Sequence, residues 1–308
     1  MMPRAASGGR SRVVRREAHA KVNVFLRVLG RRPDGYHELQ SLVLPISLAD
    51  RIRVRAASTL RVDVRGPEHL TAQVPAGGMN LALIAALALA EDCGAPRGAE
   101  VTIEKRIPVA AGLGGGSADA AATLHALNEL WGCGLDLPAL LAVGERVGSD
   151  VPALLAGAPV LVEGRGERVR PATVARLWWA VVPLGFPTRS PDAYRWWDED
   201  GGVPGPDPGP VVEAAAAGDA DALGPLLFND LEPPVARRHP EVARARERLL
   251  AAGALGAVMS GSGPTVLGLA RDGAHARRLA AALPGGIVAS GPPGPGRRVP
   301  SSVRSGVV

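Results

Sequence analysis

The stretch Pro108–Leu124, with the sequence PVAAGLGGGSADAAATL, joins a glycine-rich loop to an alanine-rich segment. A glycine backbone reaches φ angles that are closed to other residues, and its N–H groups can approach a ligand closely. Apolar residues then recur at three- and four-residue spacing over Ala118–Trp131, which predicts a helix. A glycine loop that enters a helix N-terminus gathers free N–H donors at the positive end of the helix dipole. We therefore interpret the stretch as a loop that binds the phosphates of a nucleotide.

Three familiar nucleotide-binding signatures do not match this chain. No Gly-Lys-Ser/Thr follows the glycines, which excludes a P-loop in its usual form. The glycines do not follow the Gly-x-Gly-x-x-Gly spacing with an acidic residue on a second strand, which disfavours a dinucleotide fold. The chain contains neither His-Arg-Asp nor Asp-Phe-Gly, so it is not protein-kinase-like. A tight turn with close helix packing remains the alternative for the loop taken alone.

The length and composition indicate a globular protein of two domains. The chain has 308 residues, which exceeds the usual size of one domain, and 46% of them are hydrophobic. No apolar run approaches the ~20 residues of a membrane span, and no apolar segment follows the N-terminal charges as in a secretory signal. The two cysteines, Cys93 and Cys133, have no His or Cys at metal-ligand spacing. We expect both to be buried small hydrophobic residues of a protein in the reducing cytoplasm.

The basic character of the chain resides in its two ends. Residues 1–16 contain five arginines and residues 290–308 contain three, without an acidic residue in either segment. These two tails carry +8, whereas the whole chain carries +5, which leaves −3 for residues 17–289. Because the tails are rich in Ser, Gly and Pro, we expect them to be disordered. No basic face interleaved with aromatic residues predicts a nucleic-acid-binding fold, and we expect neither nucleic acid nor membrane as a partner.

Only two of the 35 basic residues are lysines, Lys21 and Lys105. A lysine retained against such a preference for arginine indicates a position where a compact point charge is wanted.

The hydrophobic periodicity divides the chain into two domains near residue 168. Before that point we expect strands over 13–16, 22–28, 42–46, 52–55, 60–64 and 101–105, and helices over 80–92 and 138–147 besides the one after the glycine loop. After it we expect strands over 178–183, 257–260, 265–270 and 286–289, and helices over 190–197, 211–217, 221–227, 241–252 and 274–283. This order favours a split βαβ, ferredoxin-like arrangement over residues 169–289.

Several separated segments resemble one family, the GHMP kinases, which include galactokinase, homoserine kinase and mevalonate kinase. The glycine loop resembles the ATP loop of the family, and MSGSGPTV at Met259–Val266 resembles its third glycine motif. The segment AKVNVFLRVLGRRPDGYHELQS, together with GSDVP at Gly148–Pro152 and FNDLE at Phe228–Glu232, is similar to the branch that phosphorylates a cytidine diphosphate-linked methylerythritol. The resemblance covers residues 18–290 in the correct order. One departure is Ala118-Asp119, where many members have Ser-Asn.

The resemblance implies an α+β, two-domain GHMP kinase fold, with an N-terminal domain like domain 2 of ribosomal protein S5 and a ferredoxin-like C-terminal domain. It implies Mg-ATP as the cofactor and the 2-hydroxyl of 4-diphosphocytidyl-2-C-methyl-D-erythritol as the acceptor, in the non-mevalonate isoprenoid pathway. We expect a cytoplasmic monomer or weak homodimer that has no metal-binding side chains of its own. The loop residues expected to contact ATP are Pro108, Val109, Ala110, Ala111, Gly112, Leu113, Gly114, Gly115, Gly116, Ser117 and Ala118.

Two residues are expected to carry the chemistry. Asp150 lies in a turn after a helix, where its carboxylate could accept the hydroxyl proton or could cap the next segment. The resemblance implies that it is the general base. Lys21 lies between apolar residues on an expected strand, where a buried charge needs an acidic partner. We expect it to pair with Asp150 and to steady the acceptor oxygen or the transferred phosphate; a solvent-facing edge lysine is the alternative.

Four further residues are expected to bind the acceptor. Asn23 shares a strand face with Lys21 and could bind substrate or its own backbone. By resemblance, Tyr36 stacks on the cytosine, His37 binds its edge, and Tyr194 covers the opposite face. Helix packing beside two tryptophans is the alternative for Tyr194.

The roles of the smaller residues stay open. Ser117 could cap its helix or contact a phosphate or Mg²⁺. Residues 260–263 could shape the substrate side of the cleft or form a plain tight turn. Asn229 and its neighbours in FNDLE have no assigned role.

Two other functions remain open at this point. The chain could be another small-molecule kinase of the family, such as a homoserine or mevalonate kinase, which would not need the three cytosine-binding side chains. It could also be a non-catalytic nucleotide-binding protein on this fold, or one that uses its basic tails on nucleic acid.

Overall fold

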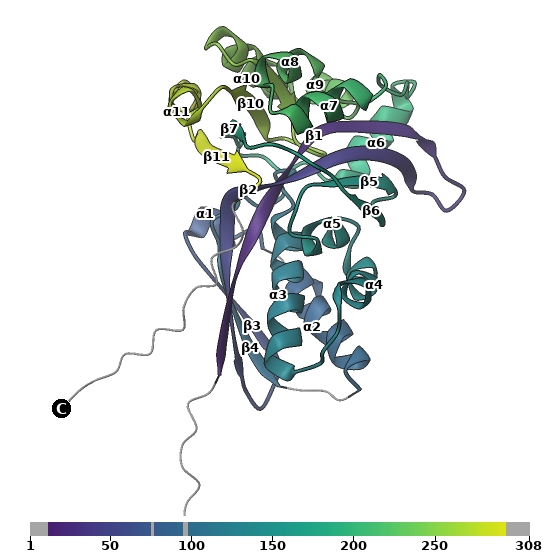
Figure 1. Ribbon diagram of the computed structural model, residues 1–308, viewed down its shortest axis with the longest axis vertical. Coiled ribbons are helices and arrows are strands. Elements are labelled where there is room, and N and C mark those ends of the chain that lie inside the picture. Colours follow the sequence, from purple (N-terminus) through teal and green to yellow (C-terminus); the bar gives the residue numbers. More distant parts are fainter. Residues whose placement is uncertain (1–11, 75–76, 95–97, 294–308) are drawn as a thin grey trace, which may run out of the picture.

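A long antiparallel hairpin runs through the whole molecule and links its two halves (Figure 1). In this computed structural model, residues 12–74, 77–94 and 98–293 are described. Strand β1 (Val13–Arg31) pairs with β2 (His37–Ala56) along its length, with three shifts of register. The four short strands expected over 13–55 are therefore parts of two long ones, because bulges bend each strand without ending it.

The first sheet extends from both ends of β2. Strands β3 (Arg61–Arg65) and β4 (Ala99–Glu104) continue it from residues 51–56, while β5 (Val160–Gly164) and β6 (Arg168–Pro171) continue it from residues 39–43. On the far side of β1, the short β8 (Phe228–Asn229) pairs in parallel. The short elements α1 (Glu68–Thr71) and η1 (Gly77–Met79) follow β3.

Besides α1, the described part of this half contains four helices, and Figure 1 shows them on one side of the sheet. They are α2 (Leu81–Asp92), α3 (Gly115–Trp131), α4 (Leu137–Val147) and α5 (Val151–Leu155). Asn80 and Asp136 cap α2 and α4, because each side chain accepts a hydrogen bond from a backbone N–H in the first turn. Helix α3 is central and buries ten of its seventeen residues, mostly alanine and leucine.

The second sheet has the strand order β11-β7-β10-β9, and every neighbouring pair is antiparallel. Its strands are β7 (Leu177–Val182), β9 (Gly256–Met259), β10 (Val266–Ala270) and β11 (Ile287–Gly291). This is the order of a ferredoxin-like split βαβ unit, so the expected topology is confirmed. Its helical elements are α6 (Ser190–Glu199), α7 (Gly209–Ala217), α8 (Ala220–Leu223), η2 (Gly224–Leu226), α9 (Glu232–Arg238), α10 (Pro240–Ala251) and α11 (Gly273–Ala281).

Both faces of the second sheet are buried, which joins the two halves. Along β7, Leu177, Trp179 and Val181 belong to the core shared with the first sheet, whereas Ala180 and Val182 belong to the core of the second half. Alternate residues of a strand point to opposite faces, so one strand supplies both cores. The sheet therefore holds its loops in a defined position against the first half.

Two expectations are corrected by the structure. The N-terminal tail is shorter than residues 1–16, because β1 begins at Val13; residues 1–11 and 294–308 lie outside the described ranges. Cys93 and Cys133 are not separate small hydrophobic residues but form a disulfide, with their Cα atoms 5.5 Å apart. This bridge joins the segments after α2 and α3, a proximity that sequence spacing cannot reveal. Helix α9 was not among the expected helices; its two prolines lie in the first turn, where proline is well tolerated.

Candidate active site

The glycine loop forms an open helix N-terminus beneath a cavity. Helix α3 begins at Gly115, three residues before the expected start, and its cap residue Gly114 has a φ of 68°. The first backbone N–H groups of a helix have no partner within it. Here those of residues 114–117 belong to residues that line a cavity of about 900 Å³. Such an array of N–H groups suits a phosphate.

The glycine loop packs against a second glycine turn, residues 260–263, which follows β9. Gly112 has a φ of 75°, and a Cβ there would clash with the carbonyl oxygen of Ser260. The hydroxyl of Ser260 donates to the carbonyl oxygen of Gly112 at 3.0 Å. Gly261 and Ser262 line the cavity. The turn after β9 therefore both supports the phosphate loop and contributes to the cavity wall.

The FNDLE segment anchors this second turn. The amide nitrogen of Asn229 donates to the carbonyl oxygens of Met259 and Gly261 at 2.8 and 2.7 Å. The carboxylate of Glu232 accepts from the backbone N–H of Met259 at 2.7 Å. Asp230 accepts from the N–H of Val28 in β1 at 2.8 Å. These residues thus have a structural role, which the sequence left unassigned.

Lys21 lies in the middle of β1 with 5% of its surface exposed. Its ammonium donates to the side-chain oxygen of Asn23 at 2.8 Å, and Asn23 donates to the Ser41 hydroxyl at 2.7 Å. The strand face shared by Lys21 and Asn23 was expected, and the contact follows from it. A Cβ on Gly114 or on Gly261 would lie 2.9 Å from Lys21, so both glycine turns close around this side chain. It is not a solvent-facing edge lysine.

Asp150 faces the same cavity from the turn before α5. One carboxylate oxygen lies 3.8 Å from the Lys21 ammonium, and 52% of the side chain is exposed. Asp150 occupies the cap position of α5, but its side chain makes no capping hydrogen bond. The capping alternative therefore does not account for this carboxylate.

The three ring side chains expected to bind a base also line the cavity. The rings of His37 and Tyr194 stack with their centroids 4.9 Å apart, and His37 Nε2 is 2.9 Å from a carboxylate oxygen of Asp198. Burial, together with the charge of Asp150, raises the pKa of the Tyr194 phenol. Tyr36 lies at the cavity edge with 51% of its surface exposed. Tyr194 therefore has a ring partner in the cavity and does not merely pack beside the tryptophans.

A buried ionic triad lies below the phosphate loop. Lys105 donates to Asp50 and, at 2.8 Å, to Asp119 in α3. Burial raises the pKa of Asp119 to about 8, against the attraction of Lys105, and the neighbouring Asp50 adds to the increase. Asp119 Oδ1 is buried without a hydrogen-bond partner among the described residues. A proton on that oxygen would allow it to donate a hydrogen bond towards Asp50.

The cavity collects nearly all the residues expected from the sequence. Two exceptions are Leu113 and Ala118, whose side chains are buried in the core because the loop turns inward at Leu113 and α3 packs against the sheet. Residues that the sequence analysis did not identify include Ser41, Asp50, Arg165 and Asp198. None of these four residues had a distinguishing sequence pattern. Their neighbour Lys105 did, because it is one of only two lysines in an arginine-rich chain.

Within the described ranges, no group of three or more His, Cys, Asp or Glu side chains could hold a metal ion. Magnesium commonly binds through nucleotide phosphates, water and one or two protein oxygens. The donor set here, with Ser117 and the half-exposed Asp150 lining the cavity, fits a metal that is held mainly by the nucleotide. None of the helices in the described part of the chain has both the length and the apolar content needed to cross a bilayer.

The fold and the glycine turns are those of a known class. Residues 80–158 match the GHMP kinases N terminal domain, and residues 211–286 match the GHMP kinases C terminal domain. The chain belongs to the GHMP kinase family.

Curated relatives and solved structures place the likeness more narrowly. The 4-diphosphocytidyl-2-C-methyl-D-erythritol kinase of Symbiobacterium thermophilum is 49% identical over 85% of this chain and 93% of its own length. A crystal structure of a 4-(cytidine 5'-diphospho)-2C-methyl-D-erythritol kinase is 39% identical, with a TM-score of 0.77 over 91% of this chain and all of that one. The homoserine kinase of Cytophaga hutchinsonii is 20% identical, with a TM-score of 0.70 over 95% of this chain and 97% of that one, and shares the fold.

Proposed function

We propose that this chain transfers the γ-phosphoryl group of ATP to the 2-hydroxyl of 4-diphosphocytidyl-2-C-methyl-D-erythritol, in the non-mevalonate route to isoprenoid precursors. The observation that carries the proposal is one cavity lined by the phosphate loop, by Lys21 and Asp150, and by Tyr36, His37 and Tyr194. A kinase that acts on a small acceptor such as homoserine would not need a base-binding wall of this kind.

Phosphoryl transfer depends mainly on positioning and on stabilisation of negative charge. The free N–H groups of residues 114–117 and the dipole of α3 bind the phosphates of ATP. Asp150 accepts the proton of the attacking hydroxyl, for which its exposed carboxylate is suited. Lys21 lies between that carboxylate and the glycine turns, where its charge stabilises the transferred phosphoryl group.

The far end of the cavity selects the acceptor. Tyr36 and Tyr194 offer aromatic faces to the cytosine, and His37 offers a ring edge that Asp198 orients. Asn23, which is hydrogen-bonded to Lys21 and Ser41 and lines the same cavity, would contact the polyol.

Mg²⁺ would enter with the nucleotide, with Ser117 as the protein hydroxyl suited to contact it. When bound, it neutralises phosphate charge. The proposed activity requires cellular ATP, so we infer a cytoplasmic enzyme. The cysteines do not contribute to this inference, because they form a disulfide.

The first experiment measures ADP release from Mg-ATP with three acceptors in parallel, namely 4-diphosphocytidyl-methylerythritol, homoserine and mevalonate. We expect turnover with the cytidine compound alone. Turnover with another alcohol would keep the fold and remove the cytosine site, while ATP binding without any turnover would favour a non-catalytic protein.

The Asp150→Asn variant tests the general base. Because the amide has the same shape but cannot accept the proton, we expect the kcat to fall by about a hundredfold or more, with ATP affinity retained. Steady-state kinetics and calorimetric titration of ATP measure the two effects. Near-normal turnover would contradict the assignment of Asp150.

A further inference from the structure

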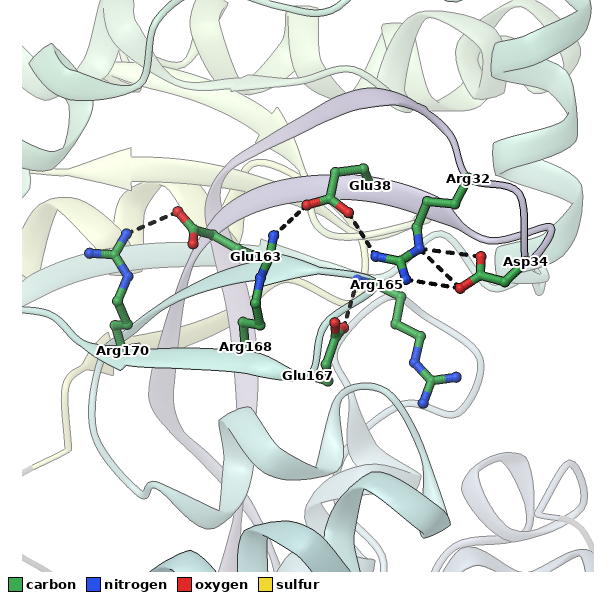
Figure 2. Close-up of polar contacts among 8 residues, drawn as sticks. All are labelled: Arg32, Asp34, Glu38, Glu163, Arg165, Glu167, Arg168 and Arg170. Atoms are coloured by element: carbon green, nitrogen blue, oxygen red, sulfur yellow. Dashed lines mark hydrogen bonds and ion pairs between the residues drawn. The ribbon is translucent and has the colours of Figure 1, made fainter.

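A cluster of charged side chains lies on the β1–β2 loop, at the start of β2 and on the hairpin β5–β6 (Figure 2). Two of its members, Asp34 and Arg165, line the cavity. Three of its arginines form salt bridges with carboxylates. Arg32 binds Asp34 and Glu38, Arg168 binds Glu38, and Arg170 binds Glu163. The charged cluster comprises Arg32, Asp34, Glu38, Glu163, Arg165, Glu167, Arg168 and Arg170.

Arg165 differs from the other three arginines. Across the described residues, no carboxylate oxygen lies within 4.0 Å of its guanidinium. Figure 2 shows its side chain directed away from the row that the other arginines and their carboxylates form. Asp34, the acid that Arg165 influences electrostatically, is already bound by Arg32. The positive charge of Arg165 is therefore left for another partner.

The backbone at Arg165 is held in place. Gly164 and Gly166, which flank it, have φ angles of 75° and 126°, conformations that suit glycine. The carboxylate of Glu167 accepts the Arg165 backbone N–H at 2.7 Å. Gly164 also pairs with Leu39 of β2, close to His37. This turn thus presents a half-buried arginine from the β5–β6 hairpin.

The turn lies between the two functional ends of the cavity. On one side, the Arg165 guanidinium lies over the Tyr36 ring, 5.2 Å from its centroid. On the other, a Cβ on Gly166 would lie 2.9 Å from the carbonyl oxygen of Ser149, next to Asp150. Arg165 itself lines the cavity.

We propose that Arg165 binds the diphosphate of the acceptor substrate. The inference rests on the proposed function, in which a base bound at Tyr36 is joined through a diphosphate to a polyol whose hydroxyl lies at Asp150. The diphosphate must therefore pass the turn that carries Arg165. A planar guanidinium forms paired, charge-assisted hydrogen bonds with phosphate oxygens. Because Arg165 is already stacked on Tyr36, its side chain loses less conformational entropy when it binds a phosphate.

The other cations of the cavity fit this role less well. Lys105 and Arg195 are each paired with carboxylates, and Lys21 lies at the glycine turns, where the proposed function assigns it to the transferred phosphoryl group. Arg31 also lines the cavity, and no salt bridge to it occurs in the part of the chain that the structure describes. Arg31 is exposed and has no ring contact there, so it serves as the competing candidate in the test.

The test compares the binding of cytidine 5'-diphosphate and cytidine by calorimetry in the wild type and in Arg165→Ala. We expect the preference for the diphosphate over the nucleoside to fall by about tenfold or more, with cytidine binding little changed. The KM for 4-diphosphocytidyl-methylerythritol should rise, while the KM for ATP should not. Arg165→Lys should retain part of the preference. Arg170→Ala is the matched control, since Arg170 lies on the same hairpin but is paired with Glu163.

Three results would overturn the inference. They are an unchanged preference in Arg165→Ala, an equal loss in Arg170→Ala, and a loss confined to Arg31→Ala. If the wild type phosphorylates the cytidine acceptor in any of these cases, the proposed function survives and only the role of Arg165 fails. If the wild type binds neither cytidine compound, both proposals fail.

Discussion

Two buried lysines lie near the phosphate loop, and their partners give them different roles. Lys105 lies between Asp50 and Asp119, and the Asp50 carboxylate compensates its charge whether or not a ligand is bound. Lys21 has one half-exposed carboxylate at 3.8 Å and a neutral amide at 2.8 Å. The charge of Lys21 is thus only partly compensated, which leaves it able to attract an incoming phosphate.

Asp119 makes stability depend on pH in a defined direction. Its pKa in the folded protein is raised to about 8, whereas an unfolded aspartate titrates near 3.9. Between these values the folded state holds a proton that the unfolded state has released. This group therefore lowers the free energy of unfolding as the pH rises through that window, by at most about 1.4 kcal/mol per pH unit.

Asp119→Asn removes this dependence, because an amide does not titrate. We expect the stability of the variant relative to the wild type to increase between pH 5 and pH 8, as measured by urea unfolding at each pH. The variant is compared with the wild type at each pH, because burial also raises the pKa values of Asp230 and Glu232. These two groups change the stability of the variant and of the wild type in the same direction. Parallel stability curves would contradict the prediction.

At the scale of elements, the start of α3 depends on the turn after β9. The glycine loop and the 260–263 turn are separated by about 150 residues, yet Ser260 binds the carbonyl oxygen of Gly112. The loop has so little side-chain volume partly because another backbone lies against it. Its glycines therefore meet a packing requirement as well as a ligand-binding one.

Gly112→Ala separates these two requirements when compared with Gly132→Ala. Both glycines have left-handed backbones, with φ values of 75° and 68°, but only a Cβ at Gly112 meets another backbone. We expect Gly132→Ala to cost about 1–2 kcal/mol of stability from backbone conformation alone. Gly112→Ala should cost more and should also weaken ATP binding. Denaturant unfolding and ATP titration measure the two effects, and equal losses in both variants would refute the argument.

At the scale of the whole molecule, the cavity of the candidate active site forms where the two halves meet. The long β1 carries Lys21, while the second half supplies Tyr194, Gly261 and Ser262 to the same cavity. The alternating faces of β7 join the two cores, and Asn229 ties β8 to the turn after β9.

Asn229→Ala weakens the contact between β8 and the turn after β9. It removes three hydrogen bonds at a buried site, because two carbonyl oxygens lose their donor and the Leu231 N–H loses its acceptor. We therefore expect a loss of about 1–3 kcal/mol and a higher KM for ATP. Asn128→Ala is the control, because it removes two bonds to Leu135 within the first half. An increase in KM as large in the control would show that general destabilisation is the cause.

Local sequence patterns predicted the structural features that depend on residues close together in the chain. The spacing of apolar residues predicted α3 and the strands of the second sheet, and the glycines predicted an open helix N-terminus. The face shared by Lys21 and Asn23 followed from strand geometry. Resemblance to the family supplied the expected pairing of Lys21 with Asp150 and the side chains proposed to bind the cytosine, which periodicity alone could not.

The tertiary structure decided what depends on residues far apart in the chain. Such contacts joined Cys93 to Cys133, enclosed Lys105 between Asp50 and Asp119, and gave FNDLE its anchoring role. They also left Arg165 as the unpaired arginine of its cluster. The physical reason is that a one-dimensional pattern reports period and turn chemistry, whereas burial and charge pairing depend on which distant side chains the fold brings together.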